Sequence, residues 1–208
     1  MAVLALAYLA GAFPTGYLVA RALAGVDVRR VGSGRTGGTN VLRSVGPLAA
    51  IVTVLGDGLK GVLAVSLARA MVGSPVAVAV AGVAVVLGHN YSVFLGWDGG
   101  AGTATSIGAA LTVHPLFGSA AMALGAAVLV GFRYASLASI AVLLALAVLF
   151  GGAALWGGLP AVYALYTAVA ALVCIAELRP NIARLLAGTE RKLTWPVARL
   201  RSKGGGSA

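Results

Sequence analysis

The sequence contains few charged residues and a single cysteine. Charged residues make up 10% of its 208 positions, whereas a soluble domain carries about a quarter. A hydrophobic content of 60% is too high for an intrinsically disordered protein. Because Cys174 is the single cysteine, an internal disulfide and a cysteine metal cluster are excluded. We interpret Cys174 as a small apolar helix residue. These features predict an all-α polytopic membrane protein.

Acidic residues are also scarce. Five Asp and Glu stand against fifteen Lys and Arg, which gives a net charge of +10. Such a balance is seen in nucleic-acid-binding proteins, but cations beside apolar spans are more simply interpreted as cytoplasmic anchors. We therefore expect a membrane lipid environment and no nucleic-acid partner.

Apolar segments of about 20 residues predict about seven transmembrane helices. Their ranges are 2–23, 47–70, 75–95, 103–114, 116–132, 135–152 and 158–177. Pro115 separates the fourth from the fifth, because proline cannot donate in a helix and disfavours helix at His114. Six spans, with one longer helix at this point, are the alternative. No basic residue precedes Arg21, so we expect the first span to be an uncleaved helix.

The cations predict an orientation. With seven spans and the amino terminus outside, the first loop, the turn at Arg133 and the carboxyl tail carry thirteen of the fifteen cations and face the cytoplasm. Arg69 alone lies near the outer face, and Lys60 lies within a span. We expect one domain over 1–192 and a basic, flexible cytoplasmic tail over 193–208.

The first loop contains a glycine-rich motif, GSGRTGGTNVLR, over residues 32–43. It includes G-x-G-x-x-G, but no βαβ unit surrounds it, so a dinucleotide site is rejected. Glycines still let backbone N–H groups surround an anion. Ser33 and Thr39 add hydroxyl donors, and Arg43 adds a guanidinium suited to phosphate. The alternative is a flexible basic loop that touches lipid headgroups.

Two further polar groups lie in or beside the predicted spans. Asp57 and Lys60 are three residues apart, so they share a helix face and can pair. Ionisable groups within a span indicate function, although a neutralised structural pair is the alternative. The glycine run at 99–102 leads into the fourth span, whose amino end is a potential anion site. His89 carries little weight alone, and we interpret His114 as structural.

The last polar groups are on the same predicted face. Ser136 opens the sixth span, where it either caps the helix or faces the site. Asn181 and Arg184 lie three residues apart on a short helix, so both can face one ligand. The alternative for this segment is a basic amphipathic anchor on the membrane surface.

Together, these segments resemble the bacterial acyl-phosphate:glycerol-3-phosphate acyltransferases, the PlsY family, from about Tyr8 to Lys192. The family's first motif is close to G-S-G-N-x-G-A-T-N-x-x-R, and it has a D-x-x-K-G element at residues 57–61. Its second motif corresponds to GHNYSVF and GGAG, and its third to LRPNIARLLAGTE. The sequence departs from the family at four positions. They are Arg35 for Asn, Ser92 for Pro, Ala101 for Lys and Leu178 for His.

The resemblance implies a seven-span fold and direct acyl transfer from acyl phosphate to glycerol 3-phosphate, without a cofactor or metal, in the bacterial inner membrane. It gives lysophosphatidic acid and phosphate for phospholipid biosynthesis, and we expect a monomer. The predicted catalytic residues are Ser33, Arg43, Lys60 and Asn181. The predicted substrate-binding residues are Gly32, Gly34, Thr39, Asn40, Asp57, His89, Gly99, Gly100, Gly102, Ser136, Arg184 and Glu190.

Three alternatives stay open. A diverged relative with another phosphorylated acceptor would keep the phosphate-binding residues. A non-catalytic lipid-binding protein would explain Ala101 and Leu178, though not the retained Ser33, Arg43 and Asn181. A small transporter is favoured only by Asp57 and Lys60 within a span, because the other motifs gather on one face instead of at the midplane.

Overall fold

The computed structural model describes residues 1–194, and every regular element in that range is helical. The elements are α1 (Ala2–Ala12), α2 (Thr15–Ala24), η1 (Val28–Arg30), α3 (Gly38–Ser44), α4 (Pro47–Met71), α5 (Pro75–Asn90), η2 (Val93–Leu95), α6 (Thr103–Val113), α7 (Pro115–Phe132), α8 (Ala135–Leu155), α9 (Ala161–Glu177) and α10 (Arg179–Leu186). Residues 195–208, most of the predicted tail, lie outside the described range. Leu193, the first residue of that predicted tail, is buried.

Prolines determine where several helices begin and end. Pro47, Pro75 and Pro115 each stand in the first turn of a helix, where the missing N–H costs nothing. The predicted break at Pro115 is confirmed, and the single longer helix is wrong, because His114 Nδ1 caps α7 by accepting from Phe117 N. The single first helix over 2–23 is also wrong. Pro14 ends it after Ala12, since proline interrupts the hydrogen-bond ladder.

Five segments are long and apolar enough to cross a membrane. They are Ala2–Ala24, Pro47–Met71, Pro75–Leu95, Pro115–Phe132 and Ala135–Leu155. The α9–α10 pair would make a sixth, although the two helices bend by 64°. The predicted fourth span, α6, is an apolar helix of 11 residues, too short to cross alone. The count of seven therefore stays a prediction.

Small residues bring the central helices together. A Cβ at Gly61 of α4 would overlap the Thr105 carbonyl of α6, and one at Gly108 would overlap the Gly58 carbonyl. In the same way, Gly11 of α1 lies against the Val85 backbone of α5. The α7, α8 and α9 helices pack beside this central group.

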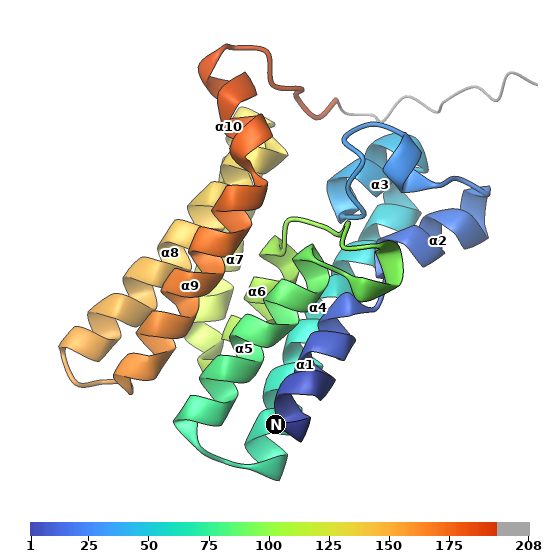
Figure 1. The fold of residues 1–208 in the computed structure, drawn as a ribbon. Coiled ribbons are helices and arrows are strands. Elements are labelled where there is room, and N and C mark those ends of the chain that lie inside the picture. Colours follow the sequence, from blue (N-terminus) through green and yellow to red (C-terminus); the bar gives the residue numbers. More distant parts are fainter. Residues whose placement is uncertain (195–208) are drawn as a thin grey trace, which may run out of the picture.

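The polar segments gather at one end of the bundle. Figure 1 shows α2, α3, the loop around η2 and α10 at the same end, with the amino terminus and the α4–α5 and α8–α9 turns at the opposite end. This is the arrangement that the charge pattern predicts, and it brings the motifs close enough to form one site.

Candidate active site

A cavity of about 400 Å³ opens among the polar segments and continues between the helices. Its polar lining includes Ser33, Arg35, Arg43, Asn181, Arg184 and Glu190. Its apolar lining includes Val54, Ile107, Met122, Leu129 and Val142, which lie further along α4, α6, α7 and α8. The cavity therefore has a cationic end beside the loops and an apolar end between the helices.

Asn40 holds the glycine-rich loop in place. Its buried amide nitrogen lies within hydrogen-bonding distance of the carbonyls of Val28 (2.8 Å), Val31 (3.1 Å) and Arg35 (2.8 Å). Its Oδ1 accepts from the Ser33 N–H at 3.1 Å. The loop could not close this tightly without Gly32, which has φ +63° and leaves no room for a Cβ beside Asn40. Asn40 thus supports the loop that presents Ser33.

An ion pair secures the start of the same loop. The Arg29 side chain donates to both carboxylate oxygens of Asp27, at 3.0 and 2.9 Å. These hydrogen bonds lower the pKa of Asp27 to about 2. The Arg29 guanidinium also lies 4.9 Å above the Tyr17 ring of α2, so the loop is tied to the helix before it.

Two arginines bring positive charge from the loop and from α3. Arg43 Nη2 donates to the Arg191 carbonyl at 2.9 Å. Arg35 Nη1 donates to Asn181 Oδ1 at 2.8 Å, and its Nη2 donates to the Glu177 carbonyl. Burial lowers the pKa of both guanidinium groups, yet an arginine stays charged in a protein. Arg35 and Arg43 therefore both keep a positive charge at the polar end of the cavity.

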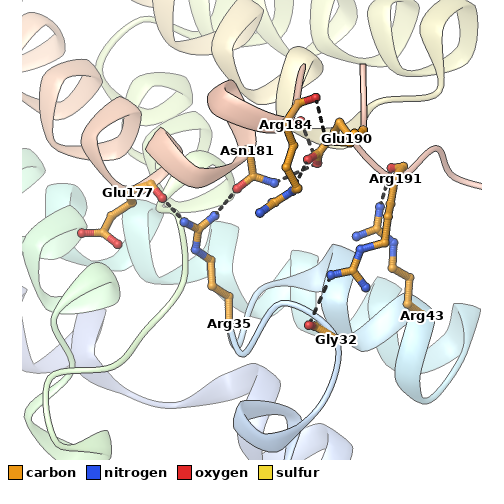
Figure 2. A network of polar contacts seen from close by, with 10 residues as sticks. Gly32, Arg35, Arg43, Glu177, Asn181, Arg184, Glu190 and Arg191 are labelled. Atoms are coloured by element: carbon orange, nitrogen blue, oxygen red, sulfur yellow. Dashed lines mark hydrogen bonds and ion pairs between the residues drawn. The ribbon is translucent and has the colours of Figure 1, made fainter. Parts of the chain in front are cut away.

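Glu190 is the centre of the polar network on the α10 side (Figure 2). Its carboxylate accepts from Asn181 Nδ2 at 2.8 Å, Arg184 Nε at 2.7 Å and Ser136 Oγ at 3.2 Å. Burial would raise the pKa of Glu190, but these hydrogen bonds and the Arg184 charge together lower it. Asn181 and Arg184 thus face one site, as their spacing predicts. Ser136 is not a helix cap, since its hydroxyl donates to Glu190.

The segment after α10 closes over the polar end of the cavity. Arg133 Nε donates to the Leu193 carbonyl at 2.9 Å, and the Leu193 N–H donates to the Arg133 carbonyl at 2.7 Å. Leu193 packs in an apolar cluster with Leu42 of α3, Ala50 of α4, Leu129 of α7 and Ala135 of α8. This contact holds Glu190 and Arg191 against the cavity.

The predicted pair within α4 is present, but only Asp57 lines the cavity. Lys60 Nζ lies 2.7 Å from Asp57 Oδ1, and His89 Nδ1 lies 3.6 Å from the same oxygen. Asp57 and His89 line the cavity, whereas Lys60 lines a separate apolar groove between α1 and α4. Lys60 therefore pairs with a cavity residue without lining the cavity itself.

The glycine run before α6 has a packing role at two positions. The Gly100 N–H donates to the His89 carbonyl at 3.1 Å, and a Cβ at Gly99 would overlap the same carbonyl. Gly102 has φ +78° and precedes α6, whose first residues line the cavity. The Thr103 hydroxyl there is buried without a hydrogen-bond partner. Free donors are thus present at the start of α6, although Gly100 does not supply one.

The cavity brings together most of the predicted site residues. Those that line it are Ser33, Thr39, Asn40, Arg43, Asp57, His89, Gly102, Ser136, Asn181, Arg184 and Glu190. Gly32, Gly34, Lys60, Gly99 and Gly100 do not. Arg35, Arg191 and Thr103 are not among the predicted site residues, although Arg35 could be expected to substitute for the charge of the missing lysine. For Arg35, a signal was present, namely a cation two positions after Ser33 inside the glycine-rich motif. Within residues 1–194, no cluster of three metal-ligating side chains occurs.

The protein is similar to known acyltransferases over nearly its whole length. The sequence model described as Glycerol-3-phosphate acyltransferase matches residues 1–188. Glycerol-3-phosphate acyltransferase 2 of Moorella thermoacetica is 45% identical over 190 residues, covering 91% of this chain and 95% of the relative. The glycerol-3-phosphate acyltransferase of Rubrobacter xylanophilus is 43% identical over 201 residues, covering 97% and 96%.

Two solved structures have the same fold. Both are crystal structures of PlsY (YgiH), an integral membrane glycerol 3-phosphate acyltransferase. The glycerol 3-phosphate form gives a TM-score of 0.85 at 33% identity, and the lysophosphatidic acid form gives 0.83 at 32%. Each alignment covers 92% of this chain and 94% of the other.

Proposed function

This chain belongs to the glycerol-3-phosphate acyltransferase family, and from that premise we propose that it moves a fatty acyl group from acyl phosphate to the sn-1 hydroxyl of glycerol 3-phosphate. The products are lysophosphatidic acid and inorganic phosphate. The chain acts as an acyl-phosphate-dependent enzyme of phospholipid biosynthesis.

The shape of the cavity carries this proposal. Lysophosphatidic acid has a charged phosphate at one end and an apolar chain at the other. The cavity has Arg35 and Arg43 at its polar end, and Ile107 and Val142 along its apolar wall. Cationic side chains favour the phosphate and apolar side chains favour the acyl chain. Both ends of one amphiphilic product are therefore accommodated in one cavity.

The reaction needs positioning and charge stabilisation more than a nucleophilic side chain. The acceptor hydroxyl attacks the acyl carbonyl carbon, the bond between that carbon and the phosphate oxygen breaks, and the hydroxyl proton leaves with the released phosphate. Arg43 and Ser33 hold phosphate oxygens, and Asn181 and Arg184 position the glycerol end. Fixed donors at the start of α6 stabilise the negative charge that develops on the carbonyl oxygen.

The remaining predicted residues support the site from behind. Asn40 shapes the loop, and Glu190 orients Asn181 and Arg184 through hydrogen bonds. Lys60 neutralises Asp57, which in turn faces His89. In this proposal Lys60 is a positioning residue that acts through Asp57, and it does not touch the substrate.

The charge pattern supports a location for the enzyme. We place it as a multi-pass protein of the bacterial inner membrane, with the cavity opening to the cytoplasm and the amino terminus outside. Arg21, Arg29, Arg30 and Arg133 all lie at the end of the bundle that carries the polar segments, in agreement with the positive-inside rule. The folded domain works as a monomer, since one chain contributes both ends of the cavity.

The test is to supply the purified protein with a long-chain acyl phosphate and glycerol 3-phosphate, and to measure phosphate and lysophosphatidic acid together. We expect equal amounts of both products. Arg43→Ala should abolish transfer without loss of expression, because it removes a charged contact to phosphate. Arg21→Ala is the control, since Arg21 is exposed and, within residues 1–194, its side chain donates a hydrogen bond only to the Gly25 carbonyl.

Two results would contradict the proposal. Folded wild-type protein that forms neither product would indicate that the chain uses another acceptor or is catalytically inactive. The substitutions Ala101 for Lys and Leu178 for His would then be the first candidates for the cause. Turnover by Arg43→Ala close to that of Arg21→Ala would remove the phosphate-binding role of Arg43.

A further inference from the structure

Arg35 crosses from the glycine-rich loop to the far side of the cavity. Its half-buried guanidinium donates to Asn181 Oδ1 and to the Glu177 carbonyl. Figure 2 shows Arg35 extending toward the start of α10, while Arg184 extends toward it from α10. One side chain of the loop therefore reaches the helix end that carries the opposite half of the site.

This contact determines how the Asn181 amide is oriented. Arg35 can only donate hydrogen bonds, and the ionised Glu190 can only accept them. Asn181 Oδ1 accordingly faces Arg35 at 2.8 Å, and Nδ2 faces Glu190 at 2.8 Å. Arg35 thus positions a side chain that is itself placed to contact the substrate.

Arg35 also has donors to spare. A guanidinium carries five N–H groups, and the two contacts to Asn181 and Glu177 use two of them. Among residues 1–194, no carboxylate lies within ion-pair distance of Arg35 or Arg43. Both cations line the cavity, and a partly desolvated cation without a counterion favours a bound anion.

We propose that Arg35 is a phosphate-binding and specificity-determining residue, which contacts the terminal phosphate group of a substrate with its free N–H groups while it holds Asn181 in position. The proposal rests on the acyl transfer proposed above and adds a residue to its site. It follows from the juxtaposition of Arg35 with Arg43 and Arg184 around one cavity, and the bound group is a phosphate dianion.

The phosphate could belong to the acyl donor or to the glycerol acceptor, and kinetics separate the two sources. If Arg35 binds the acceptor, removal of its charge raises KM for glycerol 3-phosphate. If it binds the donor, KM for acyl phosphate rises instead. Either change should be about tenfold or more, because a charge-assisted hydrogen bond is lost.

Two variants separate charge from hydrogen bonding. Arg35→Gln keeps an N–H donor and loses the charge, whereas Arg35→Lys keeps the charge and loses the planar fork. We expect KM to rise in the order wild type, Arg35→Lys, Arg35→Gln, with a smaller change in kcat. The dependence of KM on salt should weaken in Arg35→Gln. Arg30→Ala is the control, because Arg30 is exposed, lies on the same side of the molecule and does not line the cavity.

A binding measurement on the full-length protein keeps the test independent of turnover. Calorimetric titration with glycerol 3-phosphate, acyl phosphate and inorganic phosphate should show at least tenfold weaker binding of one or more of them to Arg35→Gln, and a smaller loss for Arg35→Lys. Equal binding by Arg35→Gln and wild type would overturn the proposal while leaving acyl transfer intact. Weaker binding by Arg35→Gln than by wild type, together with no acyl transfer by the wild type, would support the role of Arg35 and contradict the proposed reaction. If Arg35→Gln does not fold, Arg35→Lys is compared with the Arg30→Ala control instead. KM values and affinities of Arg35→Lys equal to those of Arg30→Ala would overturn the proposal.

Discussion

At the residue scale, the glycine-rich motif divides between substrate contact and loop support. Ser33, Asn40 and Arg43 all line the cavity, but the Asn40 amide is used to fix the backbone of the loop. The sequence predicted all three as site residues, because their side chains suit phosphate binding. It could not separate the two roles, since an asparagine that holds a loop and one that holds a substrate have the same spacing.

The buried pair of α4 shows the same limit. Spacing predicts that Asp57 and Lys60 can meet, and the 2.7 Å contact confirms it. Which member of the pair faces the cavity depends on the helices packed around α4. Asp57 lines the cavity, whereas Lys60 lies in the groove between α1 and α4. Spacing along one helix contains no information about that choice.

Glu190 gives a prediction about pH. Its folded pKa lies below its usual value, so its contribution to stability is fully present above the unfolded pKa and is lost as the pH falls through the folded pKa. Glu190→Gln should therefore be less stable than wild type at neutral pH, and the difference should shrink as the solution is acidified below about pH 4. Thermal unfolding of both proteins in detergent over an acidic pH series measures this. A difference that is constant with pH would show that the charge of Glu190 is not involved.

At the scale of helices, proline positions predicted some helix boundaries, whereas a continuous apolar run hid another. His114 and Pro115 predicted the α6–α7 break correctly. Pro14 obeys the same rule, but the apolar run on both sides of it suggested one unbroken helix. The apolar wall of the cavity could not be predicted at all. Ile107 and Val142 look like lipid-facing or core residues until the neighbouring helices are in place.

The contact between α4 and α6 gives a second prediction. Gly61→Ala should destabilise the fold by about 1–3 kcal/mol, because its methyl group would overlap the Thr105 carbonyl. Gly58→Ala on the same helix is the matched control, since its Cβ would meet only Ala104 O at an ordinary 3.7 Å. Thermal unfolding in detergent compares them. Equal midpoints for the two variants would show that the helices can separate without cost.

At the scale of the whole molecule, charge placement and fold agree on where the site lies. The arginine-rich segments predicted a common face, and within residues 1–194 the structure gathers them at one end of the bundle. The number of spans could not be settled from sequence, because α6 is short and α9 bends sharply into α10. The rule that a span needs about 20 apolar residues assumes one straight helix. It applies neither to the short α6 nor to the bent α9–α10 pair.

The orientation can be measured with introduced cysteines. Cys174 is buried, so it should not react with a membrane-impermeant maleimide. In bacterial spheroplasts, Trp156→Cys should be labelled from outside, because Trp156 is exposed at the end opposite the site. Arg30→Cys should be labelled only after permeabilisation, since Arg30 lies at the end that carries the site. The reverse pattern would place the cavity on the outer face.

The central claim is that one cavity holds the phosphate and the acyl chain of the same molecule. The most direct measurement uses lysophosphatidic acid with a photoreactive group on its acyl chain, followed by mass spectrometry of the labelled peptides. We predict labelling around Ile107, Met122 and Val142, which unlabelled lysophosphatidic acid and Arg43→Ala both suppress. Labelling confined to the exposed outer residues Leu144 and Val148, unaffected by competitor, would contradict the account.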